Sequence, residues 1–272
     1  MFADMHIHST YSDGWYTPDE LCARAVKNGV GLISVTDHDT LGGDSEKRKA
    51  AEKYGLLYVT GWEISAYENG EKVHVLGYGC KVGDAYFAFN EKRKQSALKR
   101  AKESVEKCNA LGIPVTLQDV LAERAHTDAP VHTMHIARAL VKYLGISEGE
   151  VYLKYLARGC PANSAFGRPT PKEGIDCIHA LGGIAVVAHP GRLGFPFEER
   201  EAYFQTLADY GVDGIESYYT THTEKDTEYF LKTAKKYGFF VTGGSDTHVE
   251  MQSHTIGFPR FTPSKELLER LL

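Results

Sequence analysis

An aspartate and two histidines stand on alternate positions of the first strand-like stretch of the chain, DMHIHSTYSDG at residues 4–14. Side chains two apart on a strand point to the same face, so Asp4, His6 and His8 would project together. Imidazoles gathered on one face near a strand end are typical of metal binding or proton transfer. The same pattern also fits a polar edge strand, and only the residues elsewhere in the chain can distinguish the two interpretations.

Histidines and acids also accompany each of the other apolar runs of the chain. In a β/α barrel such residues meet at the C-terminal ends of the strands, where active sites of this architecture lie. The candidate ligands are His6, His8, Asp13, His38, Glu63, His74, His189, Asp246 and His248. That many donors exceed the needs of one tetrahedral site and fit two or three metals a few ångströms apart. Because the set mixes imidazoles and carboxylates, we expect two or three divalent ions of Mn, Fe or Zn.

Such a cluster predicts hydrolysis by a metal-activated water, with no need for a serine or cysteine nucleophile. Arg192, in AHPGR, could hold a phosphate in a bidentate fork, although a surface arginine would look the same. His222, beyond the sixth strand, could protonate the leaving alkoxide or be a loop residue at a helix start. His74, within VHVLGYG, could be a core histidine rather than a ligand. We predict a ligand role for His74, substrate contact for Arg192 and a catalytic role for His222.

Four further acids adjoin the expected ligands, namely Asp4, Asp37, Asp39 and Glu216. The three aspartates are each expected to accept a hydrogen bond from a ligand imidazole and so to fix its tautomer. Glu216 either supports a ligand in the same way or forms a salt bridge.

The composition is that of a globular protein of a reducing compartment. The 272 residues are 42% hydrophobic and 25% charged, and the net charge of −5 argues against gripping nucleic acid by charge alone. Five widely spaced cysteines without a CxxC pair favour free thiols. No apolar run approaches the length of a membrane span, and the first residues do not resemble a secretion signal. We therefore expect a cytoplasmic protein with no membrane partner, and the sequence leaves its oligomeric state open.

Short apolar runs alternate with helical segments in both outer parts of the chain. Strands are expected at the first run and at 31–36, 57–60, 73–78, 184–188, 212–218 and 239–243, with helices at 17–27, 44–54, 198–210 and 223–237 and another opened by a capping box at Thr170. Between them, helical spacing covers 91–111, 118–124, 134–144 and 147–157. The pattern predicts an α/β fold, a distorted parallel (β/α)7 barrel of residues 1–89 and 161–272. Residues 90–160 would form an inserted helical subdomain that binds substrate.

Six motifs in this order, DMHIHSTYSDG, TDHDT, GWEIS, VHVLGYG, AHPGR and GSDTH, resemble those of the PHP (polymerase and histidinol phosphatase) domain family. The resemblance covers most of the chain and implies a distorted seven-stranded barrel with a trinuclear metal site. Carried over by motif, it implies one metal held by His6, His8, Glu63 and Asp246, another by Glu63 and His74, and a third position supplied by Asp13, His38, His189 and His248.

The helices after the fourth strand resemble one branch of this family, phosphoesterases that act on nucleotides or trim RNA from its 5′ end. The branch implies substrate contacts from a basic residue on the first inserted helix and from a histidine in a GRPHIARAL-like segment, which Arg100 and His135 match. Ala97 stands where a second arginine is expected, and Thr133-Met134 replace an Arg-Pro pair. Nearby residues could compensate for these departures: Arg93, Lys99 and His132. We expect hydrolysis of the terminal phosphate of a nucleotide or short oligonucleotide.

Three other functions fit part of the pattern. A histidinol-phosphate phosphatase shares the barrel and the metals, but the inserted helices favour the nucleotide branch. An amidohydrolase or deaminase also has an HxH on its first strand, with a lysine or another acid where this chain has Asp13, His38 and Glu63. A non-catalytic, metal-stabilised accessory module would be expected to have lost several ligands, whereas this set is complete.

Overall fold

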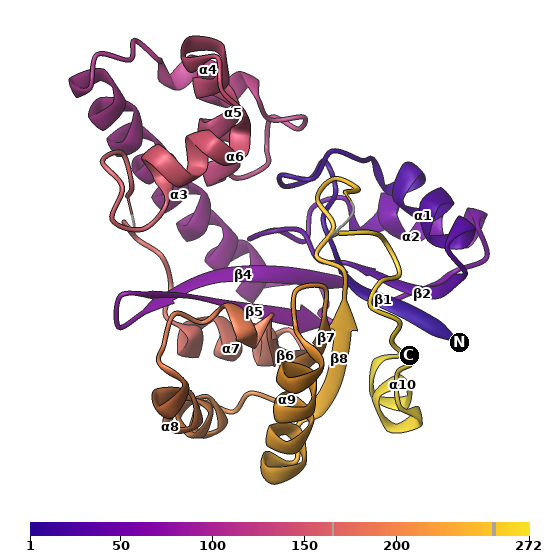
Figure 1. Ribbon diagram of the computed structural model, residues 1–272. Coiled ribbons are helices and arrows are strands. Elements are labelled where there is room, and N and C mark those ends of the chain that lie inside the picture. Colours follow the sequence, from indigo (N-terminus) through magenta and orange to yellow (C-terminus); the bar gives the residue numbers. More distant parts are fainter. Residues whose placement is uncertain (165, 252–253) are drawn as a thin grey trace.

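Strands and helices alternate in the computed structural model, which describes residues 1–164, 166–251 and 254–272 and confirms the α/β class (Figure 1). The strands are β1 (Phe2–Ile7), β2 (Val30–Val35), β3 (Leu57–Tyr58), β4 (Gly61–Glu68), β5 (Glu71–Tyr78), β6 (Ile184–Val187), β7 (Gly214–Tyr219) and β8 (Phe240–Gly244). The helices are α1 (Pro18–Lys27), α2 (Asp44–Lys53), α3 (Asp84–Ala110), α4 (Leu117–Ala122), α5 (Thr133–Leu144), α6 (Glu148–Val151), α7 (Pro171–Ala180), α8 (Phe197–Asp209), α9 (Glu224–Tyr237) and α10 (Lys265–Leu271), with a π-helical turn η1 (Tyr152–Leu156) and a 3-10 turn η2 (Pro190–Arg192).

The helices lie close to where the sequence predicts them. The capping boxes at Thr17 and Thr170 open α1 and α7, each with proline in the first turn. Helix α3 begins at Asp84 rather than at residue 91, and α10 was not predicted. The predicted strand 57–60 corresponds to the short β3, and the next residues begin β4, so Glu63 lies inside a strand rather than beyond one.

The strands form two sheets, in the orders β1-β2-β3 and β4-β5-β6-β7-β8. Pairing is parallel within the first sheet and between β6, β7 and β8, as predicted. The expectation of an all-parallel sheet is wrong for β4 and β5, because β4 pairs antiparallel with β5 and β5 pairs antiparallel with β6. The reason is the two-residue turn at Asn69 and Gly70, both with positive φ, which can join only antiparallel neighbours. The Asn-Gly pair was visible in the sequence as a hairpin signal.

Backbone contacts at the strand ends join the two sheets. Asp246 donates its N–H to the carbonyl of His6 at 2.7 Å, beside β1 and β8, and Asp39 donates to the carbonyl of Glu63 at 2.8 Å, beside β2 and β4. Gly244 permits the first approach, since a Cβ there would lie 2.4 Å from Cβ of His6. The predicted ligands near these contacts are thereby brought to one place. A closed barrel of seven β/α units stays a prediction.

Helices α1 and α2 pack on the first sheet, and α7, α8 and α9 pack on the second, through apolar clusters that contain Ile33 and Phe204 respectively (Figure 1). The helices between β5 and α7 share an apolar cluster of their own, which includes Val120 and Leu140. Their division from the rest as a subdomain at 90–160 stays a prediction. All five cysteines are unpaired, as expected. Within the described residues, no helix has the length and apolar character needed to cross a bilayer.

Candidate metal centre

The strand ends gather the predicted ligands into three adjoining groups whose donor atoms lie within 4.8 Å of one another. The groups are His6, His8, Glu63 and Asp246; His38, Glu63 and His74; and His8, Asp13, His38 and His248. Because three residues belong to two groups each, the groups form one continuous cluster. All of these side chains are buried except that of His248, which is half-buried.

Glu63 lies at the centre of the cluster. Its Oε2 is 3.3 Å from Nε2 of His8 and 2.8 Å from Nδ1 of His38, and its Oε1 is 2.5 Å from Nδ1 of His74. Burial alone would raise the pKa of this carboxyl, but the imidazoles of His74 and His38 outweigh it and hold the pKa well below its usual range. A carboxylate that belongs to two adjoining donor groups offers two oxygens, and these could serve two cations.

The donor atoms that face one another are buried and have no hydrogen-bond partner in the described part of the chain. They include Nε2 of His6, both ring nitrogens of His8, Oδ1 of Asp13, Nδ1 of His38, Oε2 of Glu63, Nε2 of His74 and Oδ1 of Asp246. Each unsatisfied buried polar atom costs about 1–3 kcal/mol, so a set of this size calls for a ligand. Imidazole nitrogens and carboxylate oxygens suit divalent cations, and the residues present therefore fit the expected metals.

His189 lies in a different part of the cluster from the one that the family resemblance implied. Its expected neighbours were Asp13 and His248, whereas its Nε2 is 3.0 Å from Oε1 of Glu63 and 3.2 Å from Nδ1 of His74. Its backbone takes φ 28°, a strained value for a residue other than glycine, and its N–H is bonded to Glu216. The geometry therefore favours grouping His189 with Glu63 and His74.

Glu216, on β7, supports two of the predicted ligands. Its Oε1 lies 3.0 Å from Nδ1 of His6, and its Oε2 accepts the backbone N–H of His189 at 2.6 Å. A carboxylate at Nδ1 fixes the tautomer that leaves Nε2 of His6 free to bind a metal. The sequence had left Glu216 undecided between this role and a salt bridge.

The three supporting aspartates make no hydrogen bond to a ligand imidazole, contrary to expectation. Asp4 accepts backbone N–H groups of Ser245 at 3.0 Å and Gly257 at 2.8 Å. Asp39 accepts the N–H of Ser65 at 2.9 Å. Asp37 likewise holds a loop rather than a ring, as described below. These carboxylates fix the backbone that carries the ligands, because each accepts main-chain N–H groups of neighbouring loops or strands.

Arg192 borders the cluster, as predicted for a substrate contact. Its Nη1 lies 3.4 Å from Oδ2 of Asp246 and 3.0 Å from the hydroxyl of Tyr219. The side chain as a whole is 59% exposed. An arginine held at one nitrogen and open at the others is able to receive an anion.

His222, whose catalytic role stays a prediction, is engaged at both ring nitrogens. Its Nδ1 donates to the carbonyl of Ser217 at 3.0 Å, and its Nε2 accepts the N–H of Gly191 at 3.1 Å. Burial also lowers the pKa of His222, which favours the neutral ring. In this arrangement, His222 joins the turn after β6 to the backbone of β7.

His135 is hydrogen-bonded at both ring nitrogens within the chain, whereas the neighbouring His132 has a ring nitrogen without a partner among the described atoms. Nδ1 of His135 accepts the N–H of His132 at 3.1 Å, and its Nε2 donates to the carbonyl of Ser12 at 3.0 Å. His132 is buried, its Nε2 is unpartnered among the described atoms, and its ring centroid is 5.6 Å from that of His38. The substrate contact expected of His135 therefore suits His132 better.

Arg100 is buried in a group of four cations formed by Lys72, Arg93, Arg100 and Arg168. Its side chain donates to the carbonyl of Phe166 at 3.0 Å and reaches no carboxylate in the described residues. Burial, together with repulsion from Arg168, lowers the pKa of Arg100 to about 9. Asp39 pairs with Arg93 at 3.5 Å and is the anion nearest to the group in the ion pairs described. A group with so much uncompensated positive charge is typical of an anion-binding site.

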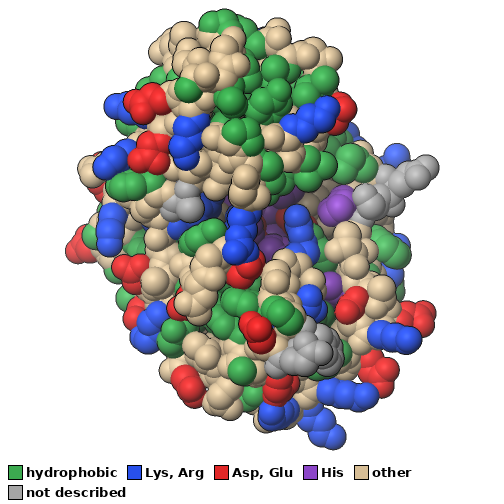
Figure 2. Space-filling view, turned by 60° about the vertical axis from the view of Figure 1, so that its left-hand side comes forward, with side chains coloured by type: hydrophobic (Ala, Val, Ile, Leu, Met, Phe, Trp, Pro, Cys, Tyr) green, Lys and Arg blue, Asp and Glu red, His purple; other side chains and the backbone are tan. Residues whose placement is uncertain are grey.

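A small cleft of about 130 Å³ adjoins this group of cations and is lined by Lys72 and Arg168, neither of which forms an ion pair with a described residue. Lys72 lies two positions before His74 on β5, so both side chains leave the same face of the strand. Figure 2 shows a hollow on this face of the molecule, with histidines at its floor and Lys and Arg side chains around its mouth. Through β5, the cleft lies next to the strand that carries the predicted ligand His74.

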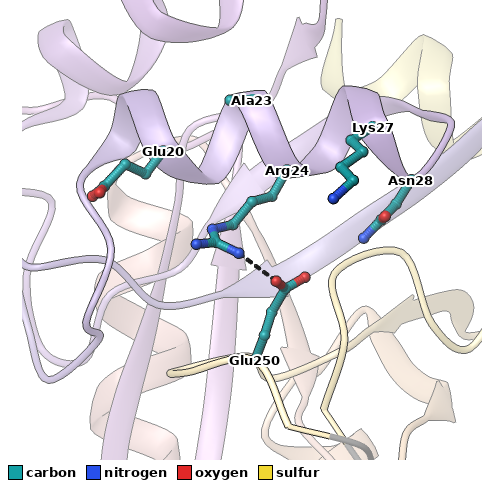
Figure 3. A pocket seen from close by; sticks show the side chains of 6 residues that line it. All are labelled: Glu20, Ala23, Arg24, Lys27, Asn28 and Glu250. Carbon is teal, nitrogen blue, oxygen red and sulfur yellow. Dashed lines mark hydrogen bonds and ion pairs between the residues drawn. The ribbon is translucent and has the colours of Figure 1, made fainter.

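A larger cavity, of about 340 Å³, lies against α1 and is lined by Glu20, Ala23, Arg24, Lys27, Asn28 and Glu250 (Figure 3). Its acids already have partners, since Glu250 pairs with Arg24 at 2.5 Å and Glu20 caps α1 through Thr17. It lies apart from the strand β5 and the start of α5, which line the smaller cleft. The metal cluster and its cleft are therefore the candidate site.

Comparison with known proteins identifies related sequences over nearly the whole chain. The sequence pattern of the PHP domain matches residues 4–116. A 5′-3′ exoribonuclease of Haemophilus influenzae is 33% identical over 250 residues, which is 90% of this chain and 89% of the relative. A 3′,5′-nucleoside bisphosphate phosphatase of Chromobacterium violaceum is 30% identical over 247 residues, 90% of this chain and 86% of the relative. A solved structure from Chromobacterium violaceum, described as an amidohydrolase with bound sulfate and no metal, superposes with a TM-score of 0.88 at 28% identity and covers 99% of this chain and 97% of its own.

Proposed function

The chain belongs to the PHP domain family and is a metal-dependent phosphoesterase, and from this premise we propose that it removes the terminal phosphate of a nucleotide or short oligonucleotide. One observation carries the proposal. A cluster of buried donor atoms without hydrogen-bond partners lies near four Lys and Arg side chains whose positive charge is only partly paired with carboxylates. A metal cluster alone would serve many hydrolases, whereas the adjoining cations favour a substrate that is itself anionic.

The nine predicted ligands are proposed to hold two or three divalent ions of Mn, Fe or Zn. Such ions, when bound, supply an activated water and neutralise the charge of the phosphate. The protein itself positions the ligands: Glu63 belongs to two of the three donor groups, and Glu216 holds the ring of His6. Holding the donors in place before substrate arrives lowers the reorganisation that hydrolysis would otherwise require.

The substrate is proposed to lie between Arg192 and the cations at the cleft. Arg192 has free N–H groups beside Asp246, where a reacting phosphate would approach the cluster. Arg168 and Lys72, without ion-pair partners among the described residues, offer charge to a further phosphate or to the chain of an oligonucleotide. His132, with its free Nε2, takes the place proposed earlier for His135. The names of the two curated relatives, an exoribonuclease and a nucleoside bisphosphate phosphatase, support a nucleotide substrate.

We further propose that the two sheets are parts of one distorted seven-unit barrel and that residues 90–160 serve as its substrate-binding subdomain. The bridges between the sheets at the ligand-bearing strand ends support the first proposal. The separate apolar cluster of the inserted helices supports the second. The unpaired cysteines favour work in the cytoplasm.

The proposal is tested by measuring release of phosphate from a nucleoside monophosphate, a nucleoside 3′,5′-bisphosphate, a 5′-phosphorylated RNA dinucleotide and histidinol phosphate, each with added Mn²⁺ or with chelator. Turnover of a nucleotide substrate is expected with Mn²⁺, and it should vanish with chelator and in Asp246→Asn. The matched control is Asp176→Asn, an exposed aspartate on α7 that should behave as the unmodified protein. Preference for histidinol phosphate, turnover of a phosphate-free amide, or no turnover with metals bound would each contradict the proposal.

A further inference from the structure

The loop that carries Asp13, residues 9–15, is fixed from below by one buried carboxylate. Asp37 accepts the N–H of Ser9 at 2.8 Å, the hydroxyl of Ser9 at 2.6 Å and the hydroxyl of Ser12 at 2.6 Å. Lys47, on α2, lies 2.6 Å from the same carboxylate and balances its charge. The Asp13 loop therefore rests on a rigid, fully buried support.

The same loop is held from above by α5, one of the helices between β5 and α7. Nη2 of Arg138 donates to the carbonyl of Asp13 at 2.7 Å. One turn earlier on the same face, Nε2 of His135 donates to the carbonyl of Ser12 at 3.0 Å. Arg138 is itself oriented by Glu148, at 3.3 Å from its Nε. Two consecutive carbonyls of the loop are thus bonded to one helix.

Two ring contacts extend this attachment along the loop. The rings of Tyr11 and His126 stack at 3.9 Å with planes 6° apart. The guanidinium of Arg138 lies 5.0 Å from the ring centre of Trp15. Every contact comes from the segment between α4 and the end of α5, so the inserted helices contact the loop over most of its length.

The position of Asp13 depends on this attachment. Oδ1 of Asp13 lies 3.3 Å from Nε2 of His248, and this oxygen has no hydrogen-bond partner among the residues described. Backbone bonds from Ser12 and Gly14 to the carbonyl of Ser9 shape the turns of the loop, whereas the carbonyl of Asp13 itself is held by Arg138. If the bond from Arg138 is lost, the Asp13 carboxylate gains freedom that must be given up again when a metal binds, and this entropy cost lowers the affinity.

We infer that α5 is a working part of the metal centre: through Arg138 and His135 it holds the Asp13 loop, and thereby sets the affinity of the group His8, Asp13, His38 and His248 for its metal. Arg138 is a positioning residue, since it touches the backbone of a ligand and not the metal or the substrate. The inference rests on the ligands proposed above. It adds a function to the inserted helices beyond substrate binding, because they complete one metal position.

The test compares Arg138→Met, Arg138→Lys and a control by equilibrium dialysis against graded Mn²⁺, with bound metal per chain measured by mass spectrometry. The matched control is Lys142→Met, one turn further along α5, whose ammonium is exposed and pairs with Glu123 away from the loop. In Arg138→Met the last equivalent of metal should bind about 10- to 100-fold more weakly, as when an outer support of a ligand is removed. Arg138→Lys, which keeps the charge and one donor, should recover part of this loss, and the control should bind as the unmodified protein does.

Unaltered affinity for the last equivalent in Arg138→Met would overturn the inference, and so would an equal weakening in Lys142→Met. Thermal unfolding of the metal-free proteins shows whether Arg138→Met is folded; if it is not, the same comparison with Arg138→Lys decides. Metal binding needs no substrate. A protein that binds its full set of metals but cleaves no phosphoester would contradict the proposed function and leave this inference standing.

Discussion

The ammonium group of Lys47 lies 2.6 Å from the carboxylate of Asp37, and both side chains are buried. Burial alone would raise the pKa of Asp37, but Lys47 and the hydroxyls of Ser12 and Ser9 outweigh it and lower the pKa to about 2. The pair joins α2 to the loop that carries a predicted metal ligand. The pair therefore stabilises both the fold and the position of that loop.

Replacing Lys47 by methionine should destabilise the protein by about 3–5 kcal/mol at pH 7, because the Asp37 charge stays buried without its partner. Urea unfolding of the metal-free protein measures the loss. The control is Lys53→Met, on the same helix, whose exposed pair with Asp19 should contribute less than about 1 kcal/mol. If the two substitutions lowered the free energy of unfolding equally, the buried Lys47–Asp37 pair would not be the stabilising interaction inferred here.

The pH dependence of the same pair has a definite sign. Because the folded protein lowers the pKa of Asp37 to about 2, the pair adds stability above the unfolded value of about 4 and loses it as the pH falls toward 2. In Lys47→Met the unpaired carboxyl should protonate at a higher pH, which relieves its burial. The difference in unfolding free energy between the two proteins should therefore shrink as the pH falls from 7 to 4, and a constant difference would be inconsistent with this account.

Glu63→Gln should remove the central carboxylate charge while preserving the shape of the side chain. We expect metal affinity to fall by more than about 100-fold, since loss of an outer support alone costs 10- to 100-fold. Metal content and Mn²⁺-dependent turnover both report the change. Glu68→Gln, at the other end of β4, keeps an oxygen for Tyr203 and Tyr210 and should leave metal content unchanged.

The sequence predicted the donors of this site better than their partners. Residues such as His6 and Asp246 could be found because they stand at or just beyond the ends of apolar runs, and the fold brings strand ends together. The grouping of His189 could not be found, since its neighbours His74 and Glu63 lie more than a hundred residues away in the sequence. The roles of His135 and His222 stay predictions, and the hydrogen bonds that hold their rings could not be predicted because the partners lie on distant segments or on the backbone of a turn.

His222→Asn tests whether His222 acts as the catalytic acid or only holds the turn after β6. Asparagine can still donate to the carbonyl of Ser217, so we expect kcat to fall by less than about tenfold, with the shape of its pH profile unchanged. A general acid contributes typically about 10²- to 10⁴-fold, and its removal would also abolish the alkaline limb of the profile. Loss of that limb would show His222 to be the catalytic acid.

Arg168→Met tests the cleft beside the metal cluster. Arg168 has no ion-pair partner in the part of the chain that the structure describes, so its charge is free to bind an anionic group of the substrate. A hydrogen bond to a charged group contributes about 1.5–3 kcal/mol, which predicts a rise in KM of about 10- to 150-fold with unaltered metal content. Arg158, in the same cleft, already pairs with Glu71, so Arg158→Met should change KM much less. Both substitutions remove one positive charge from the lining of the cleft, and their effects on KM differ only if Arg168 binds an anionic group of the substrate directly. Equal changes in KM would mean that the cleft attracts the substrate through its overall electrostatic field rather than by contact.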